Sequence, residues 1–214
     1  MPKYITEFLW AFFLVLVIAL TWNPLAIWFA LMVMVYMWWA VSGWHYNPAV
    51  TLWALLRKKI WVTDAGIYMI SQILWSLVAV ALAAYIFGWN AFLPWLWISP
   101  VNNLSFELWV WFIVEVLLTF LLVSTVLHTA CSKKTEWNSY FGLAIGMVVM
   151  VWAFAVWPIS GWAFNPAVGL GPYIYDLFTA NSWAHYVWIL YVLAPLLGWV
   201  LAAWYHAMTQ WDDM

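Results

Sequence analysis

A nine-residue phrase occurs twice in this chain, and each copy interrupts a hydrophobic stretch. The first copy is Ser-Gly-Trp-His-Tyr-Asn-Pro-Ala-Val at 42–50, and the second is Ser-Gly-Trp-Ala-Phe-Asn-Pro-Ala-Val at 160–168. A bilayer tolerates irregular backbone only where protein buries it or water bathes it. A duplicated break in corresponding places of two halves therefore predicts a transport pathway between inverted repeats.

The composition indicates a membrane protein. The chain is 69% hydrophobic and 7% charged, whereas soluble domains carry about 25% charged residues. Its six Lys and Arg residues form no basic face, which argues against binding to nucleic acid. The single cysteine, Cys131, cannot form an internal disulfide or a metal cluster. We therefore expect a lipid bilayer as the surroundings of the chain, and no metal or other cofactor.

The hydrophobic stretches fall into two length classes. Six of them approach the roughly 20 apolar residues that a spanning helix needs, at about 5–21, 25–41, 65–87, 106–130, 140–157 and 184–207. Two shorter stretches, at about 48–56 and 166–177, each begin with Asn-Pro, in which Asn caps a helix and Pro occupies its first position. The sequence thus predicts six transmembrane helices and two re-entrant half-helices.

The basic residues support this topology. With six spans and two re-entrant segments, all of them fall on one side of the membrane, which the positive-inside rule makes the cytoplasmic side. Both termini would lie on that side, and we expect a multi-pass protein of the plasma or inner membrane. The six residues are Lys3, Arg57, Lys58, Lys59, Lys133 and Lys134.

The repeat extends beyond the duplicated phrase. The segment that starts at Glu7 aligns with the segment that starts at Glu115. Each half then contains three spans and one half-helix, and because three is odd the second half must be inverted in the membrane. We predict an all-α membrane protein with a single domain over 1–214, in which inverted repeats of about 1–95 and 104–214 join in the loop at 89–103.

The two half-helices would enter from opposite faces and bring their N-termini together near the midplane. Each N-terminus carries about +0.5 of an elementary charge together with unpaired N–H groups. Asn47 and Asn165 add side-chain amide donors, which can bind a water oxygen, while the positive helix ends repel cations. The predicted pore motifs are Asn47, Pro48, Ala49, Asn165, Pro166 and Ala167.

These features together resemble the aquaporin, or major intrinsic protein, family over nearly the whole chain. The resemblance rests on the two Asn-Pro-Ala triplets, on Glu7 and Glu115, and on the glycine-containing segments at 142–146, 169–172 and 194–198. It implies a right-handed six-helix fold, a pore in each protomer of a homotetramer, and water or small uncharged solutes such as glycerol as cargo. It also implies that Glu7 and Glu115 support the loop backbones.

The chain departs from the family pattern at the predicted selectivity constriction. Val168 stands where the family usually has Arg, and alignment gives Ile27, Ala153 and Trp162 as the other three constriction positions. Such a filter is apolar. A Trp162 indole turned outward would leave a wide mouth, and one turned inward would plug it. His45 either lines the inner pore or hydrogen-bonds to a loop carbonyl.

Tryptophan is unusually abundant, with 23 residues, and several fall in the middle of spans. Their indoles either face lipid or fill the lumen. Trp28 aligns with a glycine at the crossing of the second and fifth spans, opposite Gly146. Because small residues at such crossings let helix backbones approach, Trp28 must either separate the two helices or face lipid.

Other classes of function fit the sequence less well. There is no Ser-His-Asp set, no metal-ligand spacing and no glycine-rich phosphate loop, so we do not expect an enzyme. A secondary transporter would need an ionisable site at mid-depth, whereas Glu7 and Glu115 lie toward the starts of their spans. We expect a passive channel for water, glycerol-like solutes or both. The alternative is a protein of the same fold whose pore is blocked by tryptophan side chains and does not conduct. Such a protein would be a structural or a designed variant.

Overall fold

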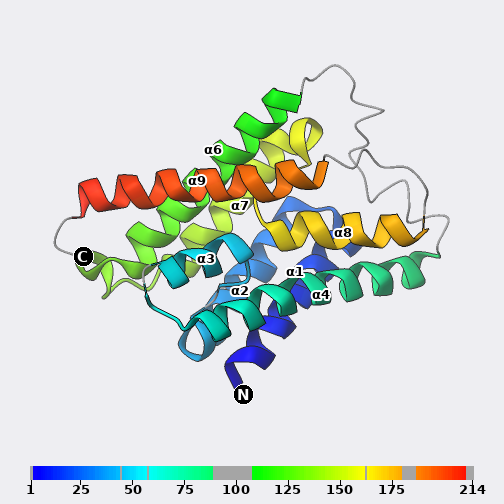
Figure 1. Ribbon diagram of the computed structural model, residues 1–214. Coiled ribbons are helices and arrows are strands. Elements are labelled where there is room, and N and C mark those ends of the chain that lie inside the picture. Colours follow the sequence, from blue (N-terminus) through cyan, green and yellow to red (C-terminus); the bar gives the residue numbers. More distant parts are fainter. Residues whose placement is uncertain are drawn as a thin grey trace.

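The computed structural model of this chain describes residues 2–43, 45–56, 58–88, 108–161, 163–179 and 187–210, which form a bundle of helices (Figure 1). The long helices within these ranges are α1 (Pro2–Thr21), α2 (Pro24–Ser42), α4 (Val62–Phe87), α6 (Leu108–Val126), α7 (Phe141–Ser160) and α9 (Val187–Thr209). Helix α6 continues as one π-helical segment, η2 (Leu127–Cys131), and the short 3-10 helix η3 (Lys133–Thr135) follows it.

The long helices correspond to the six predicted spans. Five of them, with α6 counted through Cys131, are long and apolar enough to cross a membrane, and α7 contributes a shorter apolar segment, Phe141–Trp157. The duplicated phrase gives two short helices, α3 (Pro48–Leu56) and α8 (Pro166–Thr179). The predicted all-helical fold is confirmed in the described residues, with α8 ending two residues later than expected.

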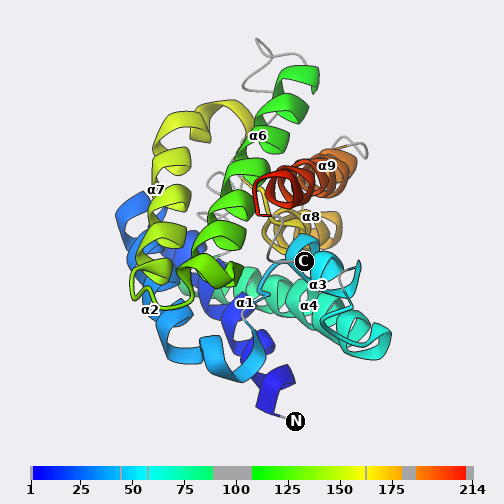
Figure 2. The ribbon, with the colours of Figure 1, turned by 90° about the vertical axis from the view of Figure 1, so that its left-hand side faces the viewer.

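The two half-helices meet end to end in the middle of the bundle. They contact each other, and both contact α4 and α9. Figure 1 shows α3 and α8 running in line between α9 on one side and α4 on the other. Figure 2 looks nearly along this line and shows α1, α2, α6 and α7 to one side of it. The starts of the half-helices therefore lie deep in the molecule, where surrounding helices bury their irregular backbone.

The contacts between helices repeat in the two halves. Helix α1 packs on α2 and α4, as α6 packs on α7 and α9, and α2 packs on α7 between the halves. Helix α4 reaches across to α8, as α9 reaches across to α3. Each of these contacts in one half therefore has a counterpart in the other half. The predicted boundary between the repeats, 89–103, lies outside the described residues.

Glycines end the helices that precede both half-helices. Gly43 follows α2 with φ 77°, and Gly161 follows α7 with φ 82°. These values lie in the left-handed region, which glycine adopts without steric cost, so the chain can leave each span and turn back inward.

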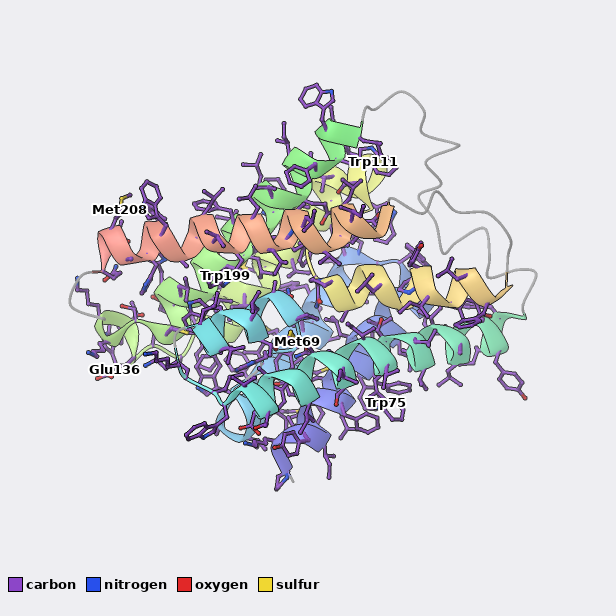
Figure 3. All side chains as sticks on the ribbon, in the orientation of Figure 1. Met69, Trp75, Trp111, Glu136, Trp199 and Met208 are labelled. Carbon is purple, nitrogen blue, oxygen red and sulfur yellow. The ribbon has the colours of Figure 1, made fainter. Side chains whose placement is uncertain are left out.

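One end of the bundle carries the C-terminal part of α9 together with the segment around η3. Nε2 of His128 lies 3.1 Å from Oγ1 of Thr209, and Figure 3 shows Glu136 and Met208 at this same end. Lys133 and Lys134 belong to η3. Two of the six basic residues, the lysines of η3, therefore lie near the C-terminal end of α9.

Candidate functional site

The site begins at the first turns of α3 and α8, where each asparagine caps its own half-helix. Oδ1 of Asn47 accepts a hydrogen bond from the Ala49 amide at 2.8 Å, and Oδ1 of Asn165 accepts one from the Ala167 amide at 2.9 Å. Because each side-chain oxygen is bound to its own helix, each amide nitrogen must point away from that helix.

The two amide nitrogens bind the opposite half of the molecule. Nδ2 of Asn47 donates to the carbonyl of Phe164 at 3.1 Å, and Nδ2 of Asn165 donates to the carbonyl of Tyr46 at 2.9 Å. These bonds tie the two loops together at their tips. Each amide nitrogen carries two hydrogens, so one donor on each asparagine is left after this exchange.

The residues that supply these carbonyls have an uncommon backbone conformation. Tyr46 has φ 47° and Phe164 has φ 30°, values that non-glycine residues seldom adopt. The same strain occurs at the same place in both halves, immediately before the asparagine. It turns each carbonyl toward the asparagine of the other half.

Two fully buried glutamates hold the loops in place from behind. Oε1 of Glu7 accepts from the His45 amide at 3.0 Å, and Oε2 accepts from the Tyr46 amide at 2.8 Å. In the second half, Oε1 of Glu115 accepts from the Ala163 amide at 3.1 Å. Its Oε2 accepts from the Phe164 amide at 2.6 Å. Each buried carboxylate is thereby satisfied by the backbone donors of a loop that has no regular structure of its own.

Further polar side chains support these loops, and sequence reasoning missed them. Oη of Tyr191 donates to the Ser160 carbonyl at 2.9 Å, and Oη of Tyr68 donates to the Ser42 carbonyl at 3.4 Å. Oγ of Ser160 donates to Glu115 at 2.7 Å. The available signal was a polar side chain inside an apolar span, since such a group needs a buried partner.

Two more polar residues were missed on α4. Nε2 of Gln72 donates to Oε2 of Glu7 at 2.8 Å, and Oγ of Ser76 donates to the Ala167 carbonyl at 2.6 Å. Gln72 and Ser76 are four residues apart and therefore share one face of their helix. This face lies against both half-helices, which explains why it is polar.

A cavity lies between the half-helix starts and the four helices α1, α2, α6 and α7. The volume open to the centres of water molecules is about 50 Å³, and one water needs roughly 10–15 Å³ by this measure. Most of its lining is apolar, and none of the lining residues within the described part of the chain carries a formal charge. Its lining residues are Leu14, Ile18, Ile27, Leu31, Val35, His45, Tyr46, Asn47, Val50, Leu122, Val126, Ile145, Val149, Ala163, Phe164, Asn165 and Val168.

The apolar lining residues follow a helical spacing. Leu14 and Ile18 on α1 are four residues apart, as are Leu122 and Val126 on α6. Residues 27, 31 and 35 on α2 and residues 145 and 149 on α7 repeat this interval. Residues four apart lie on one face of a helix. Apart from Ile27, the sequence did not single them out, because the faces toward lipid are apolar as well.

The structure places three of the four predicted constriction residues. Ile27 is fully buried and borders the cavity, and Val168 borders it as well. Ala153 is 1% exposed and lies in the same hydrophobic cluster, but it is not among the residues that line the cavity. Trp162 lies outside the described residues. His45 borders the cavity, and its Nδ1 lies 3.2 Å from Oγ1 of Thr51.

The described mid-span tryptophans pack between helices and do not line the cavity. Trp10 is fully buried, and its ring stacks on Tyr46 with centroids 3.7 Å apart. Trp199 is 5% exposed. A Cβ added to Gly146 would lie 2.4 Å from Cδ1 of Trp28, so the Trp28 indole covers this glycine at the crossing of α2 and α7.

Comparison with known proteins identifies the family. The sequence matches the family described as major intrinsic protein over residues 3–206. The chain belongs to this family. It is 32% identical to the glycerol uptake facilitator protein-like 6 of Lactiplantibacillus plantarum over 215 residues, which cover 95% of each chain. It is 33% identical to the probable aquaporin PIP2-5 of Arabidopsis thaliana over 186 residues, which cover 81% of this chain and 61% of the relative.

A solved structure shows the same fold. The X-ray structure of the aquaglyceroporin from Plasmodium falciparum superimposes with a TM-score of 0.75 at 20% sequence identity, covering 97% of this chain and 96% of that one. Members of the major intrinsic protein family are passive channels for water and small solutes. This chain is accordingly a multi-pass membrane channel and not an enzyme. No group of three or more His, Cys, Asp or Glu side chains in the described ranges is placed to hold a metal ion.

Proposed function

We propose that this protein conducts small uncharged solutes of glycerol size as well as water, and that the Asn47–Asn165 pair excludes ions. The reciprocal hydrogen bonds of the two asparagines carry the proposal. Each bond uses one amide hydrogen and leaves the other for cargo, and both asparagines border the cavity. An oxygen that passes between them accepts hydrogen bonds and cannot donate one in return.

Ion exclusion follows from the helix ends and from the lining. The N-termini of α3 and α8 together direct about one positive elementary charge toward the same point, which opposes cations. Anions are excluded elsewhere in the cavity, because the apolar side chains that line most of it cannot replace the water molecules of an anion's hydration shell. Dehydrating an ion without compensating partners costs far more than dehydrating a neutral molecule.

The apolar constriction favours solutes larger than water. Ile27 and Val168 border the cavity with hydrocarbon surface, so a polyol can place its CH groups on this side and its hydroxyl groups on the asparagine side. The name of the glycerol uptake facilitator relative, which is 32% identical over nearly its full length, supports the same cargo.

The assembly and orientation are part of the proposal. The family resemblance supports a homotetramer with one pore in each protomer. The positive-inside rule supports cytoplasmic N- and C-termini in a plasma or inner membrane, because the lysines of η3 lie at the end of the bundle that carries the C-terminal part of α9. The matching contacts of the two halves support a single domain of inverted repeats over about 1–95 and 104–214.

The proposal is tested with purified protein in lipid vesicles. Stopped-flow light scattering after an osmotic step measures water and glycerol permeability, and an internal pH dye measures proton leakage. The double variant Asn47→Asp, Asn165→Asp keeps the size of the side chains but removes the amide donors and adds negative charge at the midplane. We expect lower glycerol permeability and higher proton leakage. Unchanged values for both would refute the assignment of the pair, and wild-type vesicles no more permeable than protein-free vesicles would show that the pore is closed.

A further inference from the structure

The first half of the molecule carries a buried polar network beside the cavity, and the described residues of the second half contain no counterpart of its His45 and Thr51. It consists of Glu7, Gln72, Thr51 and His45. In the second copy of the duplicated phrase, Ala163 stands in the place of His45. Gly169, the residue after the phrase, stands in the place of Thr51. The cavity is therefore chemically different on the two sides of the asparagine pair.

The direction of every hydrogen bond in this network is set by Glu7. Its Oε2 lies 2.8 Å from the Tyr46 amide and 2.8 Å from Nε2 of Gln72. A carboxylate accepts hydrogen bonds and does not donate them. Gln72 must therefore turn its amide nitrogen toward Glu7, which fixes the orientation of the whole side-chain amide.

The amide nitrogen of Gln72 has a second hydrogen, and this one reaches Thr51. Nε2 of Gln72 lies 3.1 Å from Oγ1 of Thr51. The reverse bond, from Oγ1 of Thr51 to Oε1 of Gln72, would span 3.5 Å, well beyond the roughly 2.7–2.8 Å typical of O–H···O bonds. The Thr51 hydroxyl is thus an acceptor toward Gln72, and its own proton is available to the other neighbour.

That neighbour is Nδ1 of His45, 3.2 Å from Oγ1 of Thr51. A neutral imidazole has one donor nitrogen and one acceptor nitrogen. If Nδ1 accepts the Thr51 proton, the ring carries its hydrogen on Nε2. Within the described part of the chain, Nε2 of His45 has no hydrogen-bond partner, and His45 borders the cavity.

We propose that Thr51, oriented by Gln72, holds His45 in the tautomer protonated on Nε2 and so makes His45 a hydrogen-bond donor to cargo oxygens. Thr51 is a positioning residue, and His45 is the residue that contacts cargo. The inference rests on the proposed function, because it concerns the same cavity. It adds a third donor to the cavity beside the first turn of α3, so a polyol hydroxyl that comes from this side is bound before it reaches the asparagine pair.

The tautomer is measured directly by solid-state NMR on ¹⁵N-histidine protein in lipid bilayers, where protonated and unprotonated ring nitrogens give separate signals. The His45 signals are those that disappear in His45→Gln. We expect a hydrogen on Nε2 and none on Nδ1 in the wild-type protein. Thr51→Val should introduce the Nδ1-protonated form, and Thr51→Ser, which restores a hydroxyl, should remove it again. Thr125→Val is the matched control, because the Thr125 hydroxyl donates to the Leu121 carbonyl of its own helix and does not line the cavity.

Solute flux supplies the second measurement. Thr51→Val should lower glycerol permeability about fivefold relative to water permeability, the factor that corresponds to one neutral hydrogen bond of about 1 kcal/mol. Thr51→Ser should recover most of this ratio, and Thr125→Val should not change it. A change caused only by looser packing would alter water and glycerol together.

Two results would overturn the inference. One is a wild-type spectrum with the His45 hydrogen on Nδ1, a result that needs no variant to fold. The other is a Thr51→Val protein with the same tautomer and the same flux ratio as the wild type. The spectrum does not depend on conduction. A protein with the expected tautomer but no glycerol flux would therefore refute the proposed cargo and leave the tautomer assignment standing.

Discussion

Replacing Glu115 by Gln should destabilise the second loop by a predictable amount. Oε1 of Glu115 accepts from Oγ of Ser160 and from the Ala163 amide, and Oε2 accepts from the Phe164 amide. Glutamine keeps one oxygen and replaces the other by a donor. If the nitrogen takes the place of Oε1, it faces the Ala163 amide; if it takes the place of Oε2, it faces the Phe164 amide. One buried backbone N–H is unpaired either way.

The cost follows from this count. A hydrogen bond to a charged group contributes about 1.5–3 kcal/mol, and leaving its buried donor unpaired brings the loss to the upper part of that range or slightly above it. We expect a loss of about 3 kcal/mol. For a chain of this size that corresponds to a fall in Tm of roughly 6–12 °C.

The assay is thermal unfolding of the purified protein in detergent, followed by tryptophan fluorescence. The control is Glu136→Gln, the same chemical change at an exposed residue, which should shift the Tm by no more than about 2 °C, since exposed substitutions seldom exceed 0.5 kcal/mol. Glycerol permeability should fall in Glu115→Gln as well, because the same loop carries Asn165. Equal Tm values for the two variants would refute the reasoning that the carboxylate holds the loop.

Three further substitutions test α8 and the residues that it contacts. Gly171→Ala would place a Cβ 1.9 Å from Oγ of Ser76 and 2.9 Å from the backbone carbonyl carbon of Ser76. Size-exclusion chromatography should therefore show loss of folded protein. Gly66→Ala is the control and should behave as wild type, because its Cβ would meet no atom within 4 Å. Ser76→Ala removes the bond to the Ala167 carbonyl and should lower stability by about 1 kcal/mol in thermal unfolding, a loss that an unchanged Tm would contradict. Val168→Arg places a long cationic side chain at the cavity wall and should reduce glycerol permeability about tenfold, equivalent to about 1.4 kcal/mol, while water still passes; equal loss of both would mean that the side chain blocks the pore.

The helical framework was predictable because two strong signals agreed. Span length follows from the thickness of the bilayer, and the duplicated Asn-Pro start fixed both half-helices, with α3 found at the predicted residues 48–56. The pairing of Glu7 and Glu115 with the loops was expected from the family resemblance. The structure provides the bonds through which each carboxylate would act.

The interior of the site was less predictable for a physical reason. In a soluble helix, hydropathy separates the buried face from the exposed one, but in α2 the faces toward lipid and toward the cavity are both apolar. Leu31 therefore could not be told from Phe29 by sequence, although the first is 7% exposed and the second 51%. The indole of Trp28 was expected to separate two helices or to face lipid. It lies instead over Gly146, where the missing side chain leaves room for it.

The central claim is that two half-helices meeting at Asn47 and Asn165 form a passage for neutral molecules and a barrier to ions. The most direct measurement is a comparison of wild-type and protein-free vesicles of the same lipid, recording glycerol flux by stopped-flow light scattering and proton and sodium flux with internal dyes. We predict a large increase in glycerol flux, unaffected by proton or sodium gradients, and ion fluxes equal to those of protein-free lipid. Glycerol flux that depends on either gradient would contradict the account. So would an ion flux in the protein-containing vesicles that exceeds the flux through protein-free lipid.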